Sequence, residues 1–165
     1  MLIRARNDDD LDGCIKMAHA VHQMDGYPQY LPADLRSFIC SPAIGAWVAD
    51  VEGLVVGHVA LHRRSSEPVM ALAGAVTGQP TDRLAVVARL AVAPEVRRHG
   101  VGRALLAAAA CAATERGLWP VLDVARNLAG AVSLYQNCGW KCVGEVTVQL
   151  GAVSLEEFVF IGPPP

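Results

Sequence analysis

The fold class that the sequence predicts is α/β, with a mixed, mostly antiparallel sheet flanked by helices. Apolar strand-like segments alternate with helix-like segments between residues 84 and 137, which indicates a parallel strand pair joined by a helical crossover. Two β-rich runs, Ala43 to Val51 and Leu54 to Arg63, are joined by Glu52-Gly53 and predict an antiparallel hairpin. A length of 165 residues suits one domain over residues 1–165, with one core.

The segments before the hairpin predict one strand and two helices. Leu2 to Arg6 alternates like a short strand, and the Asp8-Asp9-Asp10 run after it suits the N-terminus of a helix. We expect that helix from about Asp9 to His22, and a second, shorter helix at Ala33 to Cys40. Residues 24–32 between them are rich in Gly, Pro and Tyr and predict a loop.

The segments after the hairpin predict a long loop followed by alternating strands and helices. Residues 64–83 carry Ser, Pro, Gly and Thr without a clear period, so we expect a loop there, near the substrate. The alternation then comprises an apolar strand, an alanine-rich helix, a strand, a short helix and two final strands. These are expected at Leu84 to Ala93, Val101 to Arg116, Trp119 to Ala125, a segment from Asn127 onward, Lys141 to Val148 and Leu155 to Ile161.

The composition is that of a globular protein and argues against two classes of partner. Hydrophobic residues make up 53% of the chain and charged residues 18%. A formal net charge of -2 supplies no overall basic field for a nucleic-acid backbone, so no nucleic acid is expected. The N-terminus lacks the apolar core of a signal peptide, and Ala104 to Ala113 is too short to span a bilayer of about 30 Å. We therefore expect a cytoplasmic protein without membrane segments.

Five cysteines, an odd number, occur without a paired CxxC spacing. Cys138 and Cys142 could form a nucleophile or a ligand pair, but small semi-buried thiols are the more common case. The sequence therefore predicts reduced cysteines and no metal.

The turn Arg97-Arg98-His99-Gly100-Val101-Gly102 lies between the apolar strand and the alanine-rich helix. Its glycines remove side chains where a backbone must approach a ligand, and a helix N-terminus offers unpaired amides to phosphate oxygens. Arg97, Arg98 and Arg103 add positive charge. Turns that merely start a helix and bind no ligand also contain glycines. The spacing alone therefore fits a phosphate site and a structural turn equally well.

Two other kinds of phosphate site fit the turn less well. A dinucleotide-binding fold needs a full G-x-G-x-x-G pattern on an early strand, with an acidic residue further along the chain, and this pattern is absent. A Walker-type loop needs Gly-Lys-Ser or Gly-Lys-Thr, which does not follow the turn.

The stretch from Leu90 to Leu106 resembles the acetyl-CoA signature of the Gcn5-related N-acetyltransferases, which reads Arg or Gln, two residues, Gly, one residue, then Gly or Ala. Asn127 to Trp140, with its Leu134-Tyr135 and Gly139-Trp140 pairs, resembles the second signature of that family. The resemblance covers about Ala43 to Val148 well and the remainder only by element order. It implies a sheet of six to seven strands, about four helices and acetyl-CoA as co-substrate.

The resemblance also implies which residues bind the cofactor. The amides of Val101 and Gly102 would hold the CoA diphosphate, and the strand segment Leu90, Ala91 and Val92 would pair with the pantetheine arm. In that family this strand bulges, so the Leu90 amide could stabilise the thioester oxygen. Further cofactor contacts are expected from Arg97, Arg98, His99, Gly100, Arg103 and Asn127. A plain helix N-cap is the alternative for Asn127.

Tyr135 matches the family position that commonly donates a proton to the departing CoA thiolate. An aromatic at helical spacing is more often a core anchor, which is the alternative for this residue. Asp123, on the strand before it, occupies a place where some relatives carry an acidic base, and it could equally be a strand-end cap. Other candidates for the base are His58, His62 and Asp82.

The expected activity is direct transfer of the acetyl group from acetyl-CoA to an amine of a small molecule or peptide. Tyr27 and Tyr30 lie where relatives build the acceptor side, although they could simply cover the core. Arg89 inside the apolar strand is expected to face a carboxylate or the substrate. The alternatives are a non-catalytic CoA-binding sensor or structural domain, transfer of a longer acyl group, or a hydroxyl acceptor. The resemblance also implies that the chain could form a homodimer, as members of that family do.

Overall fold

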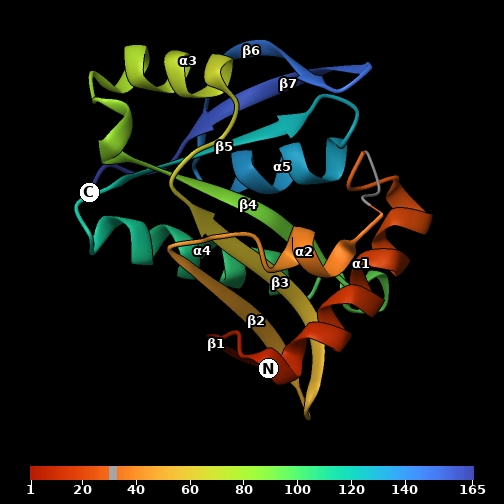
Figure 1. Ribbon diagram of the computed structural model, residues 1–165. Coiled ribbons are helices and arrows are strands. Elements are labelled where there is room, and N and C mark those ends of the chain that lie inside the picture. Colours follow the sequence, from red (N-terminus) through yellow and green to blue (C-terminus); the bar gives the residue numbers. More distant parts are fainter. Residues whose placement is uncertain (30–32) are drawn as a thin grey trace. The chain divides into compact units, whose positions relative to one another are not determined.

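The computed structural model describes residues 1–29 and 33–165 (Figure 1). This part of the chain forms seven strands and five α-helices, one helix more than expected. The strands are β1 (Leu2–Ala5), β2 (Gly45–Val51), β3 (Leu54–His62), β4 (Leu84–Val92), β5 (Trp119–Ala125), β6 (Lys141–Leu150) and β7 (Val153–Ile161). The helices are α1 (Leu11–Asp25), α2 (Leu35–Ile39), α3 (Glu67–Thr77), α4 (Val101–Thr114) and α5 (Ala129–Asn137).

Neighbouring strands follow the order β1-β2-β3-β4-β5-β7-β6. Strands β4 and β5 pair in parallel, whereas β1 with β2, β2 with β3, β5 with β7 and β6 with β7 pair antiparallel. Helix α4 connects the parallel pair along the chain, as such a crossover requires. The predicted mixed, mostly antiparallel sheet is confirmed.

Two compact units make up the chain, and each is described by itself. The first comprises Met1–Leu61 with Arg89–Ala109, and the second comprises His62–Ala88 with Ala110–Pro165. A single domain over residues 1–165 remains a prediction.

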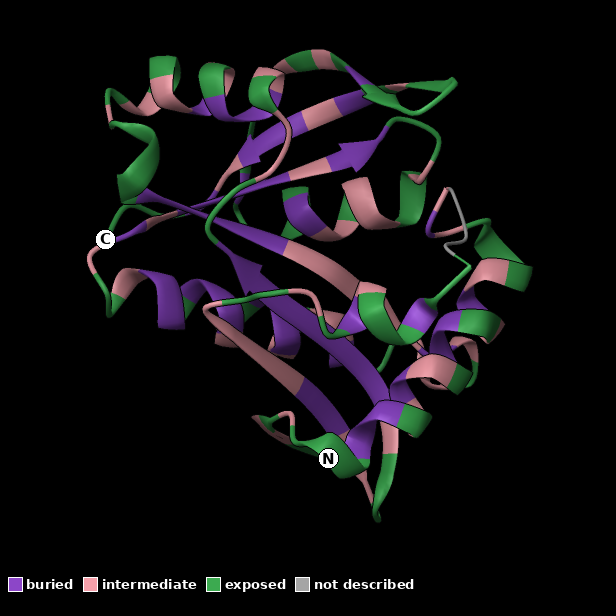
Figure 2. Cartoon of the chain, in the orientation of Figure 1, coloured by how far each residue is buried: buried purple, intermediate pink, exposed green. Residues whose placement is uncertain are grey.

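The first unit is built around the β2–β3 hairpin. Glu52 and Gly53 both have positive φ, 52° and 83°, which gives the tight turn whose twist suits paired strands. Helices α1 and α2 pack on β2 through apolar side chains, and Figure 2 shows β3 buried along most of its length. Gly57 of β3 lets α4 approach closely, because a Cβ there would lie 2.7 Å from Leu105 and 3.1 Å from Val101. The start of α4 is thereby fixed against the strand.

The second unit has α3 and α5 on opposite faces of its strands (Figure 1). Val69, Met70 and Ala73 of α3 pack on a core that includes Val121 of β5 and Val159 of β7. The paired register of these two strands places Asp123 opposite Val159 and Leu122 opposite Phe160. Because side chains alternate along a strand, Asp123 belongs to the face that α3 covers and Phe160 to the other.

The prediction of a loop at residues 64–83 is wrong, because this segment contains α3 and a short 3-10 turn, Thr81–Arg83. Pro68 lies in the first turn of the helix, where a missing N–H costs nothing, and Gly78 ends the helix with φ 67°. Val69, Met70 and Ala73 are buried. Short helices of this kind are easily taken for loops when Pro and Gly bound them closely.

Other boundaries differ by a few residues. Helix α1 begins at Leu11, after a 3-10 turn formed by the three aspartates, and ends at Gly26 with φ 69°. The last two strands, expected at Lys141 to Val148 and Leu155 to Ile161, each extend two residues further, to Leu150 and from Val153, so that only residues 151–152 form the turn between them. Among the described residues, no helix combines the length and the apolar character needed to cross a membrane.

Candidate active site

The glycine turn of the first unit has the backbone that its sequence predicts. Arg98 and Gly100 have positive φ, 66° and 81°, and Arg98, His99 and Gly100 are exposed. Helix α4 begins at Val101, directly after the turn. Beyond its chain neighbours, a Cβ on Gly100 would meet no protein atom within 4 Å, so packing does not require glycine here. Glycine is favoured by the positive φ and by the close approach of a ligand to the exposed backbone. An exposed helix N-terminus of this kind suits an anion.

Arg97, at the start of the turn, has a protein partner. Its Nη2 and Nη1 lie 2.6 and 3.1 Å from the two carboxylate oxygens of Asp25, at the end of α1, and its Nε donates to the Val92 carbonyl at 3.2 Å. This two-point ion pair ties the turn to α1 and to the end of β4. Arg98 and Arg103 are exposed beside it.

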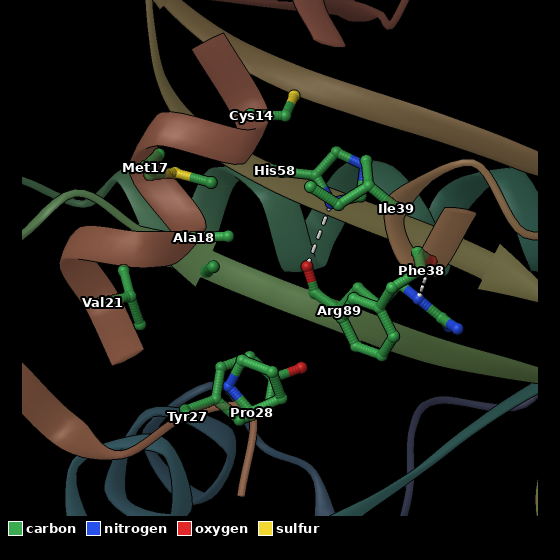
Figure 3. A pocket seen from close by; sticks show the side chains of 11 residues that line it. Cys14, Met17, Ala18, Val21, Tyr27, Pro28, Phe38, Ile39, His58 and Arg89 are labelled. Carbon is green, nitrogen blue, oxygen red and sulfur yellow. Dashed lines mark hydrogen bonds between the residues drawn. The ribbon is translucent and has the colours of Figure 1, made fainter. Parts of the chain in front are cut away.

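Within strand β4, Arg89 has a positive φ of 54°, which departs from the regular extended backbone of a strand. The Nδ1 of His58, which is 2% exposed, lies 3.1 Å from the Arg89 carbonyl oxygen, and its Nε2 lies 3.2 Å from Nη1 of Arg6 (Figure 3). A guanidinium only donates, so Nε2 accepts and Nδ1–H donates to the carbonyl. In a trans peptide the carbonyl and the following N–H point in opposite directions, so the Leu90 N–H points away from His58.

The side chain of Arg89 contacts Phe38 of α2. Its Nε donates to the Phe38 carbonyl at 2.6 Å, its guanidinium lies 4.2 Å from the centre of the Phe38 ring, and burial lowers its pKa. Arg89, Ala91 and Tyr27 line a small apolar pocket together with residues of α1 and α2 (Figure 3). Of the two tyrosines expected on the acceptor side, Tyr27 is therefore at this pocket, and Tyr30 lies outside the described residues.

Tyr135, in the second unit, is buried on α5. Its ring centre lies 5.7 Å from that of Phe160 and 6.4 Å from that of Trp140, both in tilted arrangements. It therefore belongs to the Phe160 face of β7, opposite the face that carries Asp123. The aromatic packing fits the anchor role, and it also holds the phenol in one orientation.

Asp123 is half-buried in β5, and its Oδ1 accepts a hydrogen bond of 2.8 Å from the Ser65 hydroxyl. Glu157 of β7 lies opposite Ala125 in the register of β5 and β7, diagonally across from Asp123 on the same face. Burial and the charge of Asp123 raise the pKa of Glu157 to about 8. Glu157 was not among the residues predicted from sequence, although it shares the inward period of Leu155, Val159 and Ile161 in β7.

The remaining candidates occupy varied places. Asn127 is exposed in the turn before α5, and Leu128 rather than Asn127 is the N-cap residue, so the N-cap alternative is wrong. His62 is buried and Asp82 is exposed in the 3-10 turn after α3.

The five cysteines are free thiols, and burial raises the pKa of Cys14 to about 11. The described residues contain no group of three or more His, Cys, Asp or Glu side chains arranged to hold a metal ion.

Comparison with known proteins identifies the family. Residues 42–142 match the profile described as the acetyltransferase (GNAT) domain, so the chain belongs to the GNAT acetyltransferase family. The match spans both the glycine turn and Tyr135. No curated protein matches the chain by sequence.

Solved structures show the same fold at low sequence identity. The ribosomal-protein-alanine N-acetyltransferase from Brucella melitensis has a TM-score of 0.67 and 21% identity, over 98% of this chain and 99% of that one. The ribosomal-protein-S18-alanine N-acetyltransferase from Escherichia coli gives 0.68 and 17%, over 97% and 91%. Arabidopsis thaliana NAA60 in complex with acetyl-CoA gives 0.71 and 16%, over 98% and 97%.

Proposed function

We propose that this chain transfers the acetyl group of acetyl-CoA directly to an amine of a small molecule or peptide. The observation that carries the proposal is the positive φ of Arg89 within strand β4, followed by an exposed glycine turn at the start of α4, in the segment that matches the family. Solved relatives of the same fold include one with acetyl-CoA bound. Two others are named as acting on an alanine of ribosomal proteins, which makes a peptide amine the first acceptor to test.

The first unit supplies cofactor binding in this proposal. Backbone amides at Val101 and Gly102 receive the diphosphate, Gly100 leaves room for it, and Arg98, His99 and Arg103 add positive or hydrogen-bonding groups. Arg97 acts by shaping the turn through Asp25. The segment Leu90, Ala91 and Val92 pairs with the pantetheine arm.

The Leu90 N–H stabilises the charge that develops on the thioester oxygen. Support comes from the backbone at Arg89, because His58 donates a hydrogen bond to the Arg89 carbonyl and the next N–H therefore points in the other direction. The amine nitrogen attacks the carbonyl carbon, and the bond from that carbon to the CoA sulfur breaks.

The second unit supplies proton transfer. Asp123 accepts the proton that the attacking amine loses on one face of the strands, and Tyr135 donates a proton to the departing thiolate from the opposite face. Ser65 holds Asp123 by a hydrogen bond, and two aromatic rings hold Tyr135. Asn127 is proposed to contact the pantetheine.

The test is release of free CoA from acetyl-CoA in the presence of peptides with an N-terminal alanine, lysine-containing peptides and small amines. The proposal predicts acceptor-dependent release, with an acetyl group added to the acceptor by mass. Tight binding of CoA without release for any acceptor would instead support a CoA-binding sensor.

A further inference from the structure

Glu157 is a carboxyl group in a place where a charge is costly. Its side chain is 8% exposed, and in the register of β7 it lies opposite Ala125 of β5 on one side and Val146 of β6 on the other. Asp123 lies two residues along β5 from Ala125, on the same face of the strands. Diagonal neighbours of this kind are within reach of each other's side chains.

The two carboxyl groups of Asp123 and Glu157 differ in the hydrogen bonds that they receive. Asp123 receives the Ser65 hydroxyl at Oδ1, whereas no donor in the described part of the chain reaches the buried Oε2 of Glu157. An ionised Glu157 would leave that oxygen unsolvated beside a second negative charge. A protonated Glu157 would remove the second charge and could donate to Asp123 across the diagonal of the two strands, which agrees with the raised pKa of Glu157.

Asp123 is the charged group that acts on Glu157. Strand β6 contributes Val146 beside it, α3 contributes apolar side chains to this face, and the segment before α3 contributes the Ser65 hydroxyl. Glu67 at the start of α3 is exposed. Lys141 of β6, in register with Ile161 at the far end of β7, is exposed. Glu145 and Glu156 belong to the opposite face, where Glu145 pairs with Arg126 at 3.2 Å and Glu156 accepts from Thr147.

We propose that Glu157 is a positioning residue for acetyl transfer: as a neutral acid it donates a hydrogen bond to Asp123 and, with Ser65, holds the Asp123 carboxylate in the orientation that accepts the amine proton. This rests on the proposed role of Asp123. The amine proton passes to Asp123 and then to solvent, because Asp123 is half-exposed, while Glu157 keeps its own proton.

The experiment compares the wild type with Glu157→Gln, Glu157→Ala and Asp123→Asn, and uses Glu156→Ala as a control on the opposite face. Gln keeps a donor, so E157Q should keep kcat at neutral pH within about twofold. E157A should lower kcat about tenfold, a typical effect of losing a hydrogen bond to a charged group, with the KM for acetyl-CoA unchanged. Above pH 8 the wild type should lose activity as Glu157 ionises, and E157Q should keep its activity to higher pH.

Infrared difference spectra supply a readout independent of turnover. At neutral pH, the wild type minus E157Q should show the band of a protonated carboxyl group. Absence of this band overturns the inference even if E157A fails to fold. If E157A has wild-type kcat while Asp123→Asn is inactive, the inference fails and the proposed function stands. If Asp123→Asn is fully active, the base assignment and the inference both fail.

Discussion

The cofactor segment of the first unit and the carboxyl pair of the second are built by opposite means. The turn from Arg97 to Gly102 is exposed and offers backbone groups to a ligand. It requires residues that tolerate a positive φ and that leave space for the ligand. Asp123 and Glu157 instead depend on two side chains placed together where burial makes ionisation costly. Substitutions in the turn should therefore change binding by modest factors, whereas substitutions at the pair should change the chemical step.

The largest effect is expected from Asp123→Asn. This change keeps the size and the partner Ser65 but removes the proton acceptor, so kcat should fall about 10³-fold, with little change in the KM for acetyl-CoA. Steady-state kinetics with a saturating amine would measure it. Asp82→Asn, in an exposed 3-10 turn, is the matched control and should leave both constants unchanged.

Tyr135→Phe should lower kcat about 10²-fold, because the phenol proton is lost while the packing against Phe160 and Trp140 stays. The pH profile of kcat should also change on its alkaline side. An unchanged rate across pH would leave Tyr135 only its anchor role.

Gly100→Ala should raise the KM for acetyl-CoA about tenfold, since a left-handed φ of 81° costs an L-residue roughly 1–2 kcal/mol and its Cβ would meet the ligand. Gly78→Ala is the matched control, with φ 67° and likewise open space around the Cβ. Both variants should lose similar stability in chemical denaturation. Equal KM values for the two would remove the turn from the cofactor site.

The smallest effect concerns stability. The pKa of Glu157 is raised to about 8 from 4.5, so the folded protein binds a proton that the unfolded chain releases between these values. The free energy of unfolding should therefore fall as pH rises from about 4.5 to 8, by at least about 1 kcal/mol. Glu157→Gln should lack this part of the slope in urea titrations at several pH values; an identical slope would contradict the assigned protonation.

The same contrast explains what the sequence could predict. The turn and the strand before it could be predicted because glycine, proline and helix-forming residues act on the local backbone. These elements are also neighbours in space because they are neighbours in sequence. The pairing of Asp123 with Glu157 depends on the register of β5 and β7, which are separated by α5 and β6. The signal that could have indicated this pairing is Glu157, an acidic residue at an inward-facing position of the apolar strand β7.

Two other features depended on tertiary contacts. The α3 segment, with Pro68, Gly74 and Gly78, has weak helix signals, and its apolar side chains find their partners only on the sheet. Arg97 was expected to face phosphate by its charge, yet its ion pair joins residues 72 positions apart. The family resemblance implied a bulge in this strand; the structure shows a positive φ at Arg89, whose carbonyl oxygen lies 3.1 Å from Nδ1 of the buried His58.

The central claim is that the chain moves an acetyl group from acetyl-CoA to an amine. The most direct measurement follows CoA release and acceptor mass together, with a peptide carrying an N-terminal alanine as the first acceptor. The account predicts one acetyl group added per CoA released, and loss of both in Asp123→Asn. Binding of acetyl-CoA without acceptor-dependent release, across peptides and small amines, would contradict it.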